Sequence, residues 1–255
     1  MFKVKGLSEE KVAELFPHTP VLVGYRGSIA HGMYLPNSDP NSIDDKDLMG
    51  VSLEPADIYI GLKTWEQKET MFEEYDVVCY EFRKFVRLLI KSNPNVLSML
   101  WMAPEHYIYV GNAGQLLLDY RHLFVSKQIY NAYTGYAYSQ LKKMEAYNKK
   151  GYMGEKRKKL VDKFGYDCKN AAHLIRLLRM GTEFLNTGEL EVLRHDAPQL
   201  MEIKTGQWTL EQVKAEAKYE FKRADAAFDR CTLPNKPSVE AINGIVKEVI
   251  RNYVT

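Results

Sequence analysis

The sequence lacks the features that mark membrane proteins and disulfide-stabilised proteins. No run of about 18 apolar residues occurs, so nothing indicates a transmembrane helix. The first residues, MFKVKGLSEEK, mix charges early and contain no apolar core of a signal peptide. The three cysteines (Cys79, Cys168 and Cys231) are widely spaced, and they form neither a disulfide framework nor a zinc pattern. We therefore expect a soluble cytoplasmic protein with reduced thiols and no membrane partner. The sequence does not indicate an oligomeric state.

The net charge of only +2 conceals an asymmetry between two parts of the chain. Residues 1–112 contain 11 Lys and Arg against 16 Asp and Glu, whereas residues 113–255 contain 24 against 17. An acidic first part suits metal binding, and a basic second part suits phosphate binding. Solubility alone also produces such an imbalance, so the charge pattern does not decide the function.

The first part of the chain has the pattern of a mixed sheet with helices. Short apolar or β-branched runs predict strands at 21–23, 48–53 and 76–82. Ser8 is a candidate N-cap for a helix over 8–16. A helical face begins at Phe82 and ends at Asn93-Pro94, and a short apolar helix to Trp101 follows.

The chain after Gly111 is predicted to be mainly helical. Helices are expected at about 124–148, 165–185, 209–231 and after Ser238, with a weak strand candidate at 189–194. The fold class is therefore α+β. We predict a small mixed-sheet domain over 1–112, followed by a mainly helical domain over 113–255.

One polar loop contains the residues with the clearest chemical meaning. A predicted strand ends at Gly27-Ser28, where backbone N–H groups and a hydroxyl can bind an anion. The loop ends at Asp45-Lys46-Asp47, before the next strand. Side chains alternate along a strand, so Asp45 and Asp47 are expected on one side. Two close carboxylates repel each other unless a cation such as Mg²⁺ joins them. Taken alone, the pair could also be an ordinary polar turn.

These motifs together resemble the DNA polymerase beta-like nucleotidyltransferases, and in particular the branch associated with RNA repair. The resemblance rests on GSIAHGMYLPNSDPNSIDDKDLMGV, EFRKFVRLLIKSNPNVLSMLW and GYDCKNAAHLIRLLRMGTEFL, and it covers most of residues 20–205. It implies a nucleotidyltransferase fold, with the catalytic domain over 1–112 and with triphosphate and acceptor binding by the helical domain over 113–255. It also implies Mg²⁺ or Mn²⁺, as two ions, held by Asp45 and Asp47.

The spacing between Ser28 and Asp45 is longer than the family pattern, which leaves a second register open. In that register Asp39 or Asp44 would be a ligand. We prefer Asp45 and Asp47 because Leu48-Met49-Gly50-Val51 follows them as the family pattern requires.

The family also uses a third carboxylate from a neighbouring strand. The candidates here are Asp76 and Glu81, which have opposite parity, so only one of them can face the site. Glu81 is preferred as the third catalytic and metal-binding carboxylate, because it matches the family position before Arg83-Lys84.

The predicted helix after Gly165 carries nitrogen-rich side chains at i, i+4 and i+7. Lys169, His173 and Arg176 lie within one sector of the helix, opposite an apolar stripe, and they suit the phosphates of a triphosphate. A solvated helix face is the other interpretation. His31 either contacts nucleotide or fills the loop.

A further basic stretch, Lys142 to Lys169, is accompanied by tyrosines that could stack on bases. These tyrosines could equally belong to the core; they are Tyr133, Tyr136, Tyr138, Tyr147 and Tyr152.

The expected activity is metal-dependent transfer of a nucleoside monophosphate from an NTP to an acceptor hydroxyl, with release of pyrophosphate. Gly27 and Ser28 would bind the nucleotide. An RNA or DNA end is the favoured acceptor. Two alternatives stay open: a non-catalytic nucleotide or nucleic-acid binder, and a protein-modifying nucleotidyltransferase of the toxin–antitoxin type.

Overall fold

The computed structural model describes Glu10, 15–16, 18–36, 38–39, Ser42, 44–72, 74–145 and 155–255. The chain forms two compact units. The sheet unit contains residues 1–30, 45–125 and 236–255, and the helical unit contains residues 31–44 and 126–235. These units differ from the predicted division at residue 112 in the placement of 31–44, 113–125 and 236–255. Among the described helices, none combines the length and the apolarity that a membrane span requires.

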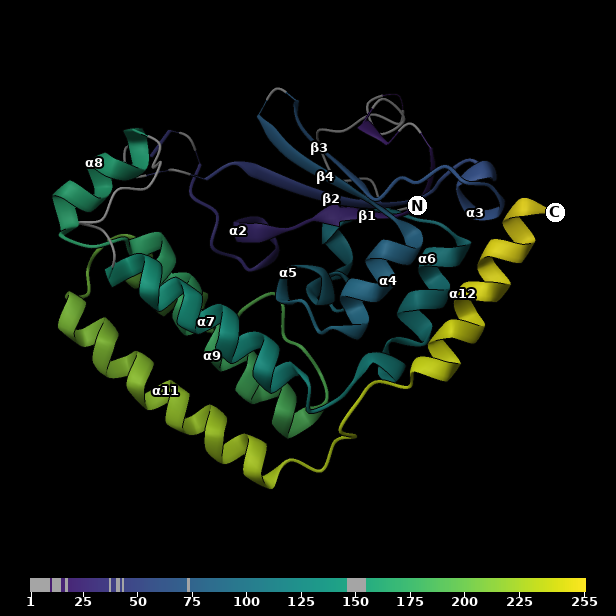
Figure 1. Ribbon diagram of the computed structural model, residues 1–255. Helices are drawn as coiled ribbons and strands as arrows, with labels where there is room; N and C mark the ends of the chain where they lie inside the picture. Colours follow the sequence, from purple (N-terminus) through teal and green to yellow (C-terminus); the bar gives the residue numbers. More distant parts are fainter. Residues whose placement is uncertain are drawn as a thin grey trace. The chain divides into compact units, whose positions relative to one another are not determined.

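The sheet unit is built on five strands in the order β3-β4-β2-β1-β5. Only β2 and β4 are parallel, and the other neighbours are antiparallel (Figure 1). The parallel pair needs a crossover, which the chain makes through α3 and β3. The strands are β1 (Thr19–Tyr25), β2 (Lys46–Leu53), β3 (Gln67–Phe72), β4 (Tyr75–Glu81) and β5 (Tyr107–Val110).

Helices bury both the central strands and their own apolar faces. Among them, α4 packs on β2 and β4, and α6 packs on β1 (Figure 1). Phe82, Phe85, Val86 and Leu89 form the buried face of α4, as the sequence predicts. The helices of this unit are α2 (Gly27–Ala30), α3 (Asp57–Ile60), α4 (Phe82–Ile90), α5 (Pro94–Leu97), α6 (Asn112–Asp119) and α12 (Val239–Val254), with 3-10 turns at Ser98–Leu100, Pro104–His106 and Arg121–Phe124.

Three of the five strands are predicted from the sequence, and two are not. Strands β1, β2 and β4 have buried β-branched or apolar residues on both faces, so the predictions at 21–23, 48–53 and 76–82 are confirmed. Strand β3 is a mostly exposed edge strand with polar residues, and β5 has four residues. Neither gives the alternation on which a strand prediction depends. Ser8, the predicted helix cap, lies outside the described residues.

The helical unit is organised around one central helix, α9. Helices α7 and α11 lie beside it, and α10 also packs on it (Figure 1). The helices predicted at about 165–185 and 209–231 are confirmed: α9 has Gly188 as its C-cap, and α11 begins with a capping box of Thr209 and Gln212. The strand expected at 189–194 is wrong, because this segment is irregular. The helices are α7 (Ile129–Glu145), α8 (Glu155–Phe164), α9 (Cys168–Thr187), α10 (Ala197–Lys204) and α11 (Leu210–Arg230).

Candidate active site and phosphate-binding pocket

A glycine turn lies directly against Asp47. Gly27 follows β1 with a φ of +62°, in the left-handed region. A Cβ atom at this position would lie 2.1 Å from Asp47 Oδ2, so only glycine leaves the carboxylate where it is. The N–H of Arg26 donates to the carbonyl oxygen of Asp47 at 2.9 Å. The turn at Gly27 and strand β2 are separated by a long loop in the sequence, and they are neighbours in the structure. Ser28 is half-buried in the short helix α2.

Asp47 has a second aspartate beside it on the neighbouring strand. In the parallel register of β2 and β4, Asp47 is paired with Asp76, so both side chains point to the same face. Arg26 interacts with both: its Nη2 lies 3.3 Å from Asp76 Oδ2 and 3.8 Å from Asp47 Oδ1. All three side chains are partly exposed, between 24% and 39%. The guanidinium is thus the cation that offsets the repulsion between the two carboxylates.

Asp45 lies one residue before β2 and is exposed. Strand alternation therefore does not by itself place Asp45 on the face of Asp47. Lys46, between the two, forms an ion pair with Glu74 at 2.6 Å. The carboxylate of Asp45 is accessible to a solvent ion, and Asp45 lies two residues before Asp47 in the chain.

Glu81 does not lie beside the aspartates, contrary to the prediction. It is paired with Ser52, five residues further along the two strands, which is roughly 16 Å away. Its side chain is 2% exposed and caps α4: Oε1 accepts from the N–H of Arg83 and Oε2 from that of Lys84, both at 2.8 Å. The carboxylate that lies beside Asp47 is Asp76. The opposite parity of the two residues was foreseen, but the strand register was not.

The competing aspartates of the loop have other surroundings. Asp44 belongs to the helical unit and is completely buried. Its carboxylate accepts from the N–H of Leu35 at 2.9 Å and pairs with Lys204, and Lys169 Nζ lies 3.6 Å from Oδ1. Asp39 lies in a turn, where its N–H donates to the carbonyl of Pro36. Asp44 therefore links the loop segment, residues 31–44, to Lys169 and Lys204.

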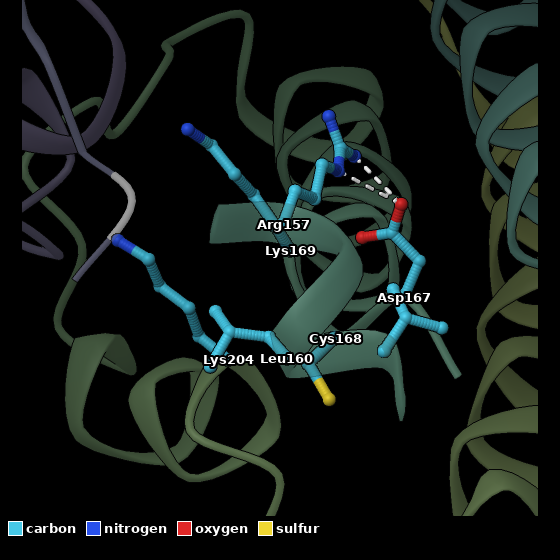
Figure 2. A pocket seen from close by; sticks show the side chains of 7 residues that line it. Arg157, Leu160, Asp167, Cys168, Lys169 and Lys204 are labelled. Atoms are coloured by element: carbon cyan, nitrogen blue, oxygen red, sulfur yellow. Dashed lines mark hydrogen bonds and ion pairs between the residues drawn. The ribbon is translucent and has the colours of Figure 1, made fainter. Parts of the chain in front are cut away.

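Lys169 lines a small pocket in the helical unit, together with Arg157 and Lys204 (Figure 2). Figure 2 shows Arg157 turned toward Asp167, to which it donates at 2.8 and 2.9 Å. The carboxylate of Asp167 also accepts from the N–H of Asn170 and so caps α9. The amines of the two lysines point away from this ion pair (Figure 2).

His173 lies near the same cations. Its Nε2 atom is buried and has no hydrogen-bond partner in the described structure. Burial lowers the pKa of His173 well below its usual value, and Arg176, Lys143, Lys169 and Arg157 add to this effect by repulsion. A ring nitrogen without a partner, surrounded by positive charge, is a favourable place for an anion.

Arg176 is not on an exposed face, contrary to the prediction. It is 9% exposed, because α9 is covered by α7, α10 and α11. Its Nη1 donates to Nε2 of His31 and to the sulfur of Met180. Burial lowers the pKa of Arg176 to about 10. Arg176 therefore supports the pocket from inside and does not line it.

His31 fills the loop rather than facing solvent. Its Nδ1 lies 2.9 Å from the carbonyl oxygen of Val192, so Nδ1 carries the proton and Nε2 accepts from Arg176. The ring is thus neutral, and burial followed by the charge of Arg176 lowers its pKa well below the usual value. These bonds attach the start of the loop segment to α9 and to the segment after it.

One group of residues in the described structure has ligand atoms close enough together for a single metal ion, and it lies in the helical unit. It consists of Glu183, Glu191 and His195. Arg194, whose side chain is completely buried, binds both carboxylate oxygens of Glu183, and Glu191 pairs with His195 at 2.7 Å. None of these three residues is among the predicted ligands Asp45, Asp47 and Glu81, so this group is not the predicted metal site.

The tyrosines near the basic stretch are in different environments. Tyr133 is buried, whereas Tyr138 is 52% exposed, with Lys142 over its ring at 4.6 Å. Tyr136 is at the margin of exposure, and Tyr147 and Tyr152 lie outside the described residues.

Sequence reasoning missed three cations that the structure places at the two sites: Arg26, Arg157 and Lys204. Arg26 could have been found, because it directly precedes the Gly27-Ser28 motif. Arg157 and Lys204 could not, because only the packing of α8 and α10 near α9 brings them to Lys169.

The mixed five-stranded sheet with its many helices is consistent with an α+β nucleotidyltransferase fold that has a helical C-terminal region. The chain belongs to the RNA repair pathway DNA polymerase beta family, whose model matches residues 9–247. It is therefore an enzyme of the nucleotidyltransferase class, and enzymes of this type generally use divalent metal ions.

The chain is also similar to a solved structure, that of a nucleotidyltransferase-like protein from Exiguobacterium sibiricum 255-15. The two are 12% identical over 95% of this chain and 77% of that chain, with a TM-score of 0.31. No curated protein matches the chain.

Proposed function

We propose that the protein transfers a nucleoside monophosphate from an NTP to an acceptor hydroxyl and releases pyrophosphate. The observation that carries this proposal is the pairing of Asp47 with Asp76, with Gly27 packed against the carboxylate of Asp47. A turn that can bind phosphate and a pair of carboxylates thus meet at one end of two parallel strands. This arrangement supplies both parts that phosphoryl chemistry needs, an anion site and a cation site.

The carboxylates fit a divalent metal. Mg²⁺ and Mn²⁺ prefer oxygen ligands, and a guanidinium already occupies the position of a cation between Asp47 and Asp76. We assign Asp45, Asp47 and Asp76 as the ligands, with Asp76 in the role predicted for Glu81 and with two ions as the expected number. Bound metal would polarise the α-phosphate and lower the pKa of the acceptor hydroxyl.

The protein groups have separate tasks in this reaction. The backbone after Gly27 and the hydroxyl of Ser28 hold the phosphates. Asp76 orients the acceptor hydroxyl and draws its proton. The hydroxyl oxygen forms a bond to the α-phosphorus, the bond from that phosphorus to the pyrophosphate oxygen breaks, and pyrophosphate leaves with the electron pair. Arg26, released from the carboxylates, is next to Gly27 in the chain and can pair with a phosphate.

The pocket of the helical unit is proposed to bind a phosphate group of a substrate. Lys169 and His173 keep the role predicted for them, and Arg157 and Lys204 join them. Arg176 acts through His31 and through its charge rather than by contact. The acceptor proposed is a nucleic-acid end, which is supported by the RNA-repair family and by the basic second part of the chain.

The test is incubation of the purified chain with each α-labelled NTP, Mg²⁺ or Mn²⁺, and RNA, DNA or protein acceptors. We expect labelled nucleic acid and release of pyrophosphate. Asp45→Asn with Asp47→Asn, and separately Asp76→Asn, should abolish transfer. Asp39→Asn, in the turn of the same loop, is the matched control and should stay active.

Two results would contradict the proposal: transfer retained in the Asp45/Asp47 double variant, or nucleotide binding with no pyrophosphate from any acceptor. The second result would support a non-catalytic binder. Label found only on protein would replace the nucleic-acid acceptor by a protein hydroxyl.

A further inference from the structure

A basic groove runs between α9 and α11 within the helical unit. It encloses about 260 Å³ and lies apart from the residues that line the phosphate pocket. Ala226 and Ala227 also line it, and their small side chains leave the space open. Thr182 and Asn186 line its α9 side with polar groups.

The groove is positively charged without compensation from its own lining. Lys222, Arg223 and Arg230 line it, and no Asp or Glu does. Glu220, beneath the surface of α11, holds Arg223 with two contacts of 3.1 Å. Neither Lys222 nor Arg230 forms an ion pair with another residue that the structure describes. Such a site attracts a chain of negative charges.

One wall of the groove is an exposed aromatic ring. Tyr219 is 57% exposed, and the guanidinium of Arg223 lies over its ring at 5.7 Å from the centroid. An exposed ring with a guanidinium near it is a surface on which a base can stack. From Tyr219 to Arg230 the helix rises about 16 Å, the length of about five stacked nucleotides.

We propose that this groove binds a single-stranded nucleic acid, with phosphates at Lys222, Arg223 and Arg230 and a base on Tyr219. An acidic polypeptide would use the cations equally well, but it has no planar groups for the exposed ring. The binding itself goes beyond the proposed function. That the bound strand is the acceptor rests on the proposed function.

The test is the fluorescence anisotropy of a labelled 12-nucleotide single-stranded RNA with the full chain, over a series of salt concentrations. Lys222→Ala with Arg230→Ala should weaken binding at least about tenfold. The same change should reduce the slope of log affinity against log salt by about 1.4, since each single-strand phosphate contact contributes about 0.7. Lys214→Ala with Lys247→Ala, which removes the same charge from exposed positions outside the groove, should leave the slope unchanged.

Stacking is tested separately from charge. Tyr219→Ala should weaken binding by about tenfold at unchanged salt slope, whereas Tyr219→Phe should bind like the wild type. Equal salt slopes for the two lysine-containing double variants would overturn the proposal. Wild-type affinity in Tyr219→Ala, or competition by polyglutamate as effective as that by unlabelled RNA, would also overturn it.

The fates of the two proposals can be told apart. Asp47→Asn should retain the RNA affinity of the wild type, because it lies in the other unit. RNA binding that depends on the groove without any nucleotide transfer would refute the proposed function and leave the groove. Transfer that is insensitive to Lys222, Arg230 and Tyr219, with RNA affinity also unchanged, would refute the groove alone.

Discussion

Arg26 is a built-in counter-ion, since its guanidinium lies within ion-pair distance of both Asp47 and Asp76. A divalent ion that binds these carboxylates must displace it. Arg26→Gln removes the competitor and leaves the two aspartates to repel each other. We expect Mn²⁺ to bind about tenfold more tightly, equal to about 1.4 kcal/mol, as measured by electron paramagnetic resonance of the free ion.

The same variant should be less stable without metal and should gain more stability from it. Melting in EDTA and in Mn²⁺ measures both effects. Arg87→Gln is the matched control, because it removes an exposed arginine from α4 in the same unit. Unchanged Mn²⁺ affinity in Arg26→Gln would show that the guanidinium does not compete for the site.

Gly27 is the residue whose replacement should damage the site most selectively. Alanine there takes a left-handed conformation that costs about 1–2 kcal/mol. Its Cβ would also meet Asp47 Oδ2 at 2.1 Å, so the carboxylate must move. Gly27→Ala should lower both Mn²⁺ affinity and transfer, by about a hundredfold for transfer if the carboxylate moves by about 1 Å.

Gly244→Ala is the control for this change. Gly244 lies in α12 with nothing near the position of an added Cβ, so alanine should leave activity unchanged and raise stability by about 0.5–1 kcal/mol. Full transfer in Gly27→Ala would mean that the contact with Asp47 has no role in the reaction.

At the scale of elements, the last residue of β4, Glu81, is also the N-cap of α4. Glu81 satisfies two N–H groups at the start of α4. Glu81→Ala should therefore cost about 0.5–2 kcal/mol of unfolding free energy in urea and leave Mn²⁺ affinity unchanged. Asp76→Asn should instead lower the Mn²⁺ affinity and leave the unfolding free energy unchanged. If Glu81→Ala lost Mn²⁺ binding at unchanged stability, Glu81 would have to be assigned as a metal ligand after all.

The elements also show which parts of the fold the sequence can predict. Buried strands such as β1 and β2 are recognisable because their apolar runs are bounded by glycine and polar turns. Helices such as α9 and α11 are recognisable from caps and periodicity. The edge strand β3 is stabilised by pairing with β4, a long-range contact that its own polar sequence does not encode.

The candidate site also has parts that the local sequence predicts and parts that depend on long-range pairing. Gly27 and Asp47 could be predicted because one motif contains both. The choice between Asp76 and Glu81 depends on the register of β2 against β4, which two separate runs of sequence do not determine. Arg176 was misplaced because amphipathic reasoning assumes one buried face, and α9 is covered on several sides.

At the scale of the whole molecule, histidines whose pKa values are lowered in the folded protein make stability depend on pH. The pKa values of His31 and His173 are lowered in the folded protein, chiefly by burial, while in the unfolded chain they are near 6.5. Below that pH the unfolded chain binds more protons than the folded protein does. The contribution of these histidines to stability is therefore fully present above about pH 6.5 and is lost as the pH falls. The expected slope is at most about 1.4 kcal/mol per pH unit for each histidine.

Urea unfolding at a series of pH values between 5 and 8 measures this slope. His31→Gln should reduce it, because it removes one histidine that binds a proton more readily in the unfolded chain than in the folded protein. His122→Gln, at an exposed position, should not change it. An identical slope in the wild type and His31→Gln would mean that folding does not change the pKa of His31.

The division of the chain into two units has a consequence for dissecting the enzyme. The backbone passes from one unit to the other four times, after residues 30, 44, 125 and 235. A fragment ending at residue 125 would lack α12, whose Tyr253 hydroxyl lies 3.4 Å from the carbonyl of Leu53. It would also leave the buried carboxylate of Asp44 without Lys204. No single cut in the chain separates the two units. The gene can therefore be divided into separately expressed units only by permuting or grafting its segments.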